Sequence, residues 1–161
     1  MRVISKQNNS RMCAICGLDN PFGVQARFYV MEDNSVMSRF QFRAEHQSYP
    51  GRVHGGLITA MLDEIGLRAY WAIEPEVLAV TLRLDTKYRK PVPYGETLLA
   101  QGIILSSSSR FLKSRSVIRS LTGDILAEAE LQYLKLPSDQ VSDADYHEEM
   151  CYPLVDDVTE L

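Results

Sequence analysis

The chain has 161 residues, of which 45% are hydrophobic and 24% are charged, and its mean hydropathy is -0.15. This composition is typical of one globular domain. The apolar runs fall short of the roughly 18 residues that a membrane span needs, and the amino terminus lacks the apolar segment of a secretory signal. We therefore expect a cytoplasmic protein.

The charge of the chain is unevenly distributed. Residues 138–161 hold eight acids and no Lys or Arg, so a total of -4 leaves residues 1–137 with a net charge of +4. A mildly basic body suits a small polyanionic ligand, and no nucleic-acid-binding motif accompanies it. We expect a small-molecule substrate, no nucleic-acid or membrane partner, and a peripheral acidic tail that is partly ordered at best.

The three cysteines, Cys13, Cys16 and Cys151, are too few to predict a disulfide framework. Cys13 and Cys16 form a C-x-x-C motif, but no second pair or nearby histidine completes a zinc site. The strand–helix context of redox-active pairs is also missing. We predict a structural turn, with no metal and no cofactor; a metal or redox role is the alternative.

The first half of the chain predicts a hairpin followed by a buried helix. Residues 1–23 are polar and rich in turn formers, whereas residues 24–31 and 36–44 alternate between apolar and polar side chains. Residues 55–73 are apolar on nearly every side of a helix, which is typical of a buried helix. Glu74-Pro75 ends this segment.

The second half predicts strands. Residues 78–88 place Leu78, Val80, Leu82 and Leu84 on one face, and three further strands are expected over residues 97–105, 111–120 and 125–136. One helix among consecutive strands predicts an α+β domain with an antiparallel sheet wrapped around the helix. The organisation is a turn-rich segment (1–23), a central domain (24–137) and the acidic tail (138–161).

Two glycines open the helix, and their backbone N–H groups have no partner within it. Such groups carry partial positive charge, so Gly55 and Gly56 could bind a carbonyl oxygen that becomes an oxyanion. The alternative is that these glycines simply end a loop.

Asp63 lies in the middle of the predicted helix. Its neighbour Glu64 can pair with Arg68 four residues on, but Asp63 has no such partner. Burying an unpaired carboxylate is costly, so either a group elsewhere in the fold satisfies it or it is a desolvated base or nucleophile with a raised pKa. Gly55 and Asp63 are about 12 Å apart along the helix, which indicates that a second copy of the chain completes the site.

The pattern His54-Gly55-Gly56 followed by Asp63 resembles hotdog-fold acyl-CoA thioesterases of the PaaI type, in the 4-hydroxybenzoyl-CoA thioesterase superfamily. The resemblance covers roughly residues 12–136. It extends to four further stretches: Cys13 to Gly23, Ser48-Tyr49-Pro50-Gly51, Ala79-Val80-Thr81 and residues 88–95.

This resemblance implies a hotdog fold, a curved antiparallel sheet around one long central helix, and hydrolysis of a thioester to a carboxylic acid and CoA without a cofactor. It implies that Gly55 polarises the thioester carbonyl, that Asp63 attacks it or activates water, and that His54 shapes the loop and contacts the thioester. Thr81 matches a Ser or Thr near the acid, although its alternation places it with Arg83 unless the strand is bulged.

The chain departs from the family pattern before the histidine, where many relatives carry a water-orienting asparagine. Ser48 stands there with Gln47 beside it, which predicts weaker turnover without changing the fold. Arg89 and Lys90 could bind the CoA phosphates; the alternative is that they only keep an exposed strand soluble.

Two other functions stay open, a hotdog enoyl hydratase or dehydratase and a non-catalytic acyl-CoA-binding module. In each case we expect a homodimer or a dimer of dimers (a homotetramer), because an unpaired edge strand invites pairing with a second copy.

Overall fold

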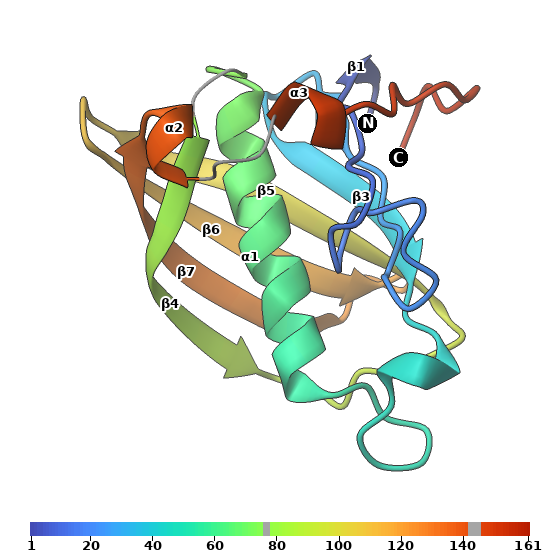
Figure 1. Cartoon of the computed structure of the whole chain (residues 1–161). Coiled ribbons are helices and arrows are strands. Elements are labelled where there is room, and N and C mark those ends of the chain that lie inside the picture. The colour runs from blue at the N-terminus through green and yellow to red at the C-terminus, as the bar shows by residue number, and fades with distance from the viewer. Residues whose placement is uncertain (76–77, 142–145) are drawn as a thin grey trace.

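The computed structural model describes residues 1–75, 78–141 and 146–161, and in these ranges one long helix packs on a seven-stranded antiparallel sheet (Figure 1). The elements are β1 (Val3–Lys6), β2 (Tyr29–Met31), β3 (Val36–Gln41), the 3-10 helix η1 (Ala44–His46), α1 (Gly55–Trp71), β4 (Leu78–Tyr88), β5 (Thr97–Ser107), β6 (Phe111–Ser120), β7 (Ile125–Leu136), α2 (Ser138–Val141) and α3 (Tyr146–Glu149). None of the helices in the described ranges is long and apolar enough to cross a membrane.

The sheet has the strand order β1-β2-β3-β5-β6-β7-β4 and curves around α1 (Figure 1). This confirms the predicted architecture. Two details differ from the prediction: Val3–Lys6 adds a strand within the segment expected to be only turns, and β2 is shorter than residues 24–31. Gln25 has a φ of 57°, which lies in the left-handed region and interrupts an extended strand there.

The core forms where α1 lies on the sheet. Met61, Leu62 and Ile65 are fully buried, and a glycine on β5 sets how closely the helix approaches. A Cβ atom on Gly102 would lie 2.2 Å from the Ile65 carbonyl oxygen, so no other residue fits there without moving the helix. The helix backbone therefore rests directly on β5.

Strand β4 contains a bulge that changes which side chains face α1. Thr81 pairs with Tyr133 while Arg83 pairs with Gln132, so Leu82 is an extra residue. Because the alternation shifts by one, Thr81 before the bulge and Thr86 after it both reach α1. The predicted single face of Leu78, Val80, Leu82 and Leu84 is therefore wrong, and Leu82 is 52% exposed.

The described part of the C-terminal segment packs against the N-terminal residues. Isolated bridges join Arg2 to Glu160 and Asn9 to Tyr152, and the Lys6 ammonium lies 2.6 Å from the Asp156 carboxylate. The expectation of a peripheral tail is wrong for this part, because its acid finds a half-buried basic partner. Two of the tail's acids, Asp143 and Asp145, lie outside the described residues.

Candidate active site

The Asp63 carboxylate is half-buried and hydrogen-bonded by one side chain of β4. The Thr81 hydroxyl lies 2.9 Å from Oδ1 and 3.1 Å from Oδ2. The bulge at Leu82 makes this possible, since it turns Thr81 toward α1 although Thr81 alternates with polar residues. The fully buried Tyr133 donates a 2.9 Å hydrogen bond to the Asp63 main-chain carbonyl, which holds the helix turn in place.

Burial raises the pKa of the Asp63 carboxyl, and the hydrogen bonds from Thr81 and Tyr133 offset this effect only in part. The negative charge of Glu64 raises it further. No salt bridge among the described residues involves Asp63; Arg68 pairs with Glu64 instead, at 2.9 Å. The predicted Glu64–Arg68 pair is thus confirmed, and Asp63 is a desolvated acid without a basic partner in the described ranges.

The N-terminus of α1 forms a second cluster. His54 is the N-cap residue, and its Nδ1 accepts a 3.0 Å hydrogen bond from the Gly56 N–H. Gly56 therefore has no free donor in this conformation. Among the residues that the structure describes, the Gly55 N–H has no acceptor, so Gly55 is the donor available to a ligand.

Tyr88 closes this cluster, and no role was predicted for it. Its hydroxyl donates to the Gly55 carbonyl at 3.0 Å and lies 2.6 Å from the Thr59 hydroxyl. Tyr88 ends β4 on the side that faces α1 after the bulge. Because alternation counted from Leu78 ignores the bulge, the sequence could not place this hydroxyl.

Basic side chains surround a cavity of about 370 Å³ beside Gly55 and Tyr88. Arg89 bonds Glu128 at 2.7 Å and Lys90 bonds Asp124 at 2.8 Å, so acids compensate both predicted phosphate-binding residues. Arg52, which sequence analysis missed, also lines the cavity, and its guanidinium donates to the Gly51 carbonyl at 3.2 Å.

Gln47 and Ser48 lie in the exposed loop before α1. The Gln47 side-chain oxygen accepts from the Tyr94 hydroxyl at 2.9 Å, and the Ser48 N–H donates to the Arg52 carbonyl at 2.9 Å. No hydrogen bond in the described ranges joins either residue to Asp63. One chain thus holds the acid and the helix-terminus donor as separate clusters, about 12 Å apart along α1.

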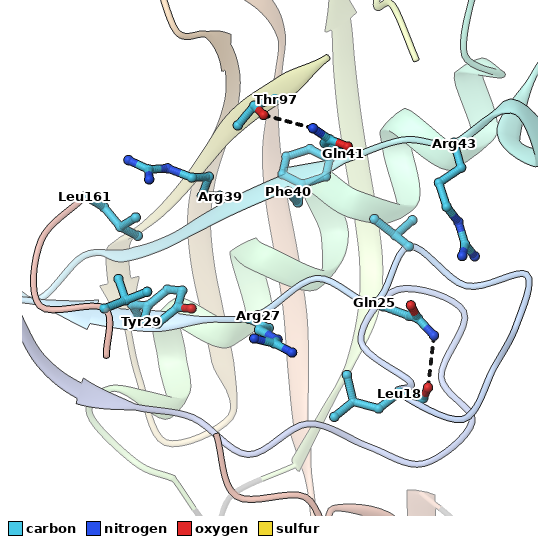
Figure 2. A pocket seen from close by; sticks show the side chains of 12 residues that line it. Leu18, Gln25, Arg27, Tyr29, Arg39, Phe40, Gln41, Arg43, Thr97 and Leu161 are labelled. Atoms are coloured by element: carbon cyan, nitrogen blue, oxygen red, sulfur yellow. Dashed lines mark hydrogen bonds between the residues drawn. The ribbon is translucent and has the colours of Figure 1, made fainter. Parts of the chain in front are cut away.

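A larger hollow of about 660 Å³ lies elsewhere, between β3 and the residues that precede β2 (Figure 2). Figure 2 shows Arg27, Arg39 and Arg43 around it, with Leu161 at one side. None of the predicted site residues lines this hollow. The candidate chemistry therefore stays with α1 and β4.

The comparisons with known proteins agree with this geometry. Residues 50–127, which contain Gly55, Asp63 and Thr81, match the family model of the thioesterase superfamily. Acyl-coenzyme A thioesterase THEM4 of Mus musculus is 29% identical over 112 residues, which cover 69% of this chain and 47% of the mouse protein. The chain thus spans about half the length of this relative.

Solved structures share the fold. The crystal structure of a thioesterase superfamily protein gives a TM-score of 0.70 at 26% identity, covering 77% of this chain and 60% of that one. A Bacillus halodurans protein solved with CoA gives 0.62 at 22% identity, covering 71% of this chain and 76% of that one. The curved sheet around α1 is the hotdog fold, and the chain belongs to the thioesterase superfamily.

Proposed function

We propose that this protein is an acyl-CoA thioesterase of the PaaI type, which hydrolyses a thioester to a carboxylic acid and CoA. The observation that carries the proposal is the desolvated Asp63 carboxylate, which only hydroxyl and main-chain groups hold in place. The similarity to an acyl-coenzyme A thioesterase of Mus musculus supports it.

The proposed reaction needs a base or nucleophile and a donor for the developing oxyanion. Asp63 either takes a proton from water as the water attacks the carbonyl carbon, or attacks that carbon itself to form an anhydride that water then cleaves. The carbon–sulfur bond breaks in both routes, and the CoA thiolate leaves and is protonated. The Gly55 N–H stabilises the oxyanion, while His54 fixes the loop through Gly56. The proposal includes no cofactor and no metal.

CoA fits the charge at the start of α1. The cavity beside Gly55 is lined by Arg52, Arg89 and Lys90. A bound phosphate could draw Arg89 and Lys90 from their exposed acid pairs at small cost, since exposed ion pairs contribute little. We propose that the nucleotide end of CoA binds here, in a cytoplasmic enzyme.

The site is proposed to be complete only in a homodimer, alone or within a dimer of dimers. Strand β4 ends the sheet and leaves an eleven-residue edge without proline, which suits pairing with a second β4. On α1, Gly56, Ala60, Asp63 and Leu67 share one incompletely buried stripe that a second copy could cover. Such pairing would bring Asp63 of one chain toward the partner's helix terminus.

A panel of acyl-CoA chain lengths and aryl-CoAs, with release of free CoA thiol as the readout, tests the activity. We expect at least one substrate to be cleaved catalytically. Enoyl-CoA substrates are assayed in parallel for hydration of the double bond. Hydration without thiol release would favour a hydratase, and saturable binding with neither reaction would favour an acyl-CoA-binding module.

Gly55→Pro tests the oxyanion donor. Proline suits the first helical position and lacks the N–H, and His54 already has the extended conformation, with ψ at 131°, that precedes proline readily. We expect kcat to fall by roughly 10²–10³-fold, with circular dichroism and melting temperature preserved.

Mixing this variant with Asp63→Asn tests the composite site. If each site takes Asp63 from one chain and Gly55 from its partner, every mixed dimer has one intact site. Random mixing by co-refolding then restores about a quarter of the wild-type rate, because half of the dimers are mixed. If one chain supplies both groups, no activity returns, and the shared-site proposal is wrong.

A further inference from the structure

The C-x-x-C motif lies against α1 and forms a cluster outside the proposed active site. The sulfur atoms of Cys13 and Cys16 and a carboxylate oxygen of Glu64 lie within 4.8 Å of one another. Cys13 is half-buried, whereas Cys16 is 1% exposed. Solvent molecules can therefore reach one sulfur, while the other is accessible chiefly through its neighbour.

A tight turn holds the two sulfurs together. The N–H groups of Ile15 and Cys16 point at the Cys13 sulfur, at 3.3 and 3.5 Å, and the Gly17 N–H donates to the Cys13 carbonyl at 2.9 Å. A Cβ atom on Gly17 would lie 2.4 Å from that carbonyl oxygen, so this turn requires glycine. The backbone thus directs partial positive charge at the more accessible sulfur.

A buried arginine serves as the cation of this cluster. The Arg68 guanidinium is 1% exposed; its Nη2 donates to the Cys16 sulfur at 3.0 Å and its Nε to Glu64 at 2.9 Å. These are two of the three groups that a metal ion would need as ligands. The fixed positive charge at both of them disfavours a divalent cation.

The protonation states of the two sulfurs differ. A hydrogen bond from the Cys16 thiol lowers the pKa of Cys13 to about 7, against the opposing effects of burial and of the Glu64 charge. Donating that hydrogen bond, together with burial, raises the pKa of Cys16. Cys13 is therefore substantially a thiolate at neutral pH, which is the state that attacks disulfides.

We propose that Cys13 and Cys16 form a redox-active dithiol that exchanges with small-molecule disulfides. The Cys13 thiolate attacks one sulfur of a disulfide RSSR and expels a thiolate RS⁻, which leaves a mixed disulfide on Cys13. Cys16 loses its proton to solvent, attacks the Cys13 sulfur and expels the second RS⁻. The cysteine pair loses two electrons, RSSR gains them, and both expelled thiolates take up protons. This site does not depend on the proposed thioesterase activity.

The test uses the full chain with Cys151→Ser, which removes the exposed third thiol. The reduced protein is incubated in buffers of defined reduced-to-oxidised glutathione ratio, and free thiols are counted by maleimide labelling and intact mass. We expect both thiols to disappear together without a lasting glutathione adduct, and to return with a dithiol reductant. The rate should rise as the pH increases through about 7.

Two further variants in that background assign the roles. Cys16→Ser should accumulate one glutathione on Cys13, because nothing resolves the mixed disulfide. Cys13→Ser should react at least about tenfold more slowly, since the remaining thiol is buried and protonated. Melting curves of each reduced variant confirm that it is folded.

Three results would overturn the proposal. The thiols could stay reduced in the most oxidising glutathione buffer, or Cys16→Ser could collect no adduct. The purified protein could instead hold one zinc ion per chain by elemental analysis, with removal of the zinc required for labelling. The last result would assign Cys13, Cys16 and Glu64 to a metal site.

Discussion

Asp63→Asn is expected to lower kcat for thioester cleavage by roughly 10²–10⁴-fold, the usual contribution of a positioned base. The amide has the shape of the carboxyl and can still accept the Thr81 hydrogen bond, but it neither takes a proton nor attacks carbon effectively. Free CoA thiol release measures the loss, and the affinity for acyl-CoA should stay close to that of the wild type.

The same substitution should not destabilise the fold at neutral pH. Burial raises the pKa of Asp63 in the folded state, so folding favours its protonated form. Its contribution to stability is present at low pH and is lost as the pH rises through the raised pKa. We therefore expect Asp63→Asn to melt at or above the wild-type temperature at pH 7, and wild-type activity to fall on acidification through that pKa.

Asp85→Asn is the matched control, because Asp85 is an exposed carboxylate on the same side of the chain's edge strand, β4. It should change neither kcat nor the acid limb of the pH profile. If Asp63→Asn kept activity within tenfold of the wild type, Asp63 would not be the base or nucleophile. The proposed mechanism would then fail.

Arg68→Ala is expected to lower the free energy of unfolding by about 3–5 kcal/mol, the usual effect of removing one partner of a buried ion pair. Arg68 bonds the Asn8 carbonyl and the Cys16 sulfur in addition to Glu64. Its guanidinium also stacks on the rings of Phe28 and Trp71, each at 4.6 Å. Alanine would leave these groups without their shared partner.

Thermal and denaturant unfolding at one fixed protein concentration measure this effect. A chain of this size should lose roughly 6–20 °C in melting temperature. Arg83→Ala is the control, since Arg83 is 76% exposed and lies 4.0 Å from Asp85, a pair worth about 1 kcal/mol at most. Equal losses in the two variants would show that the Arg68 cluster does not stabilise the fold.

The local pattern of the chain was enough to predict the order of the main elements and the position of the acid. Apolar residues at nearly every turn predicted a buried helix over residues 55–73, and α1 (Gly55–Trp71) confirms it within two residues. The Glu64–Arg68 pair was also predictable, because residues four apart on a helix are neighbours. Such features depend on backbone periodicity alone, which short stretches of sequence contain.

The tertiary structure decided which side chains meet across elements. The bulge at Leu82 reverses the alternation of β4 and brings both Thr81 and Tyr88 to α1, and strand periodicity cannot predict an inserted residue. The burial of Arg68 against Cys16 likewise depends on the N-terminal segment folding back over the helix. These contacts join residues 18 to 60 positions apart in the chain, so only the packing of the sheet, helix and N-terminal segment determines them.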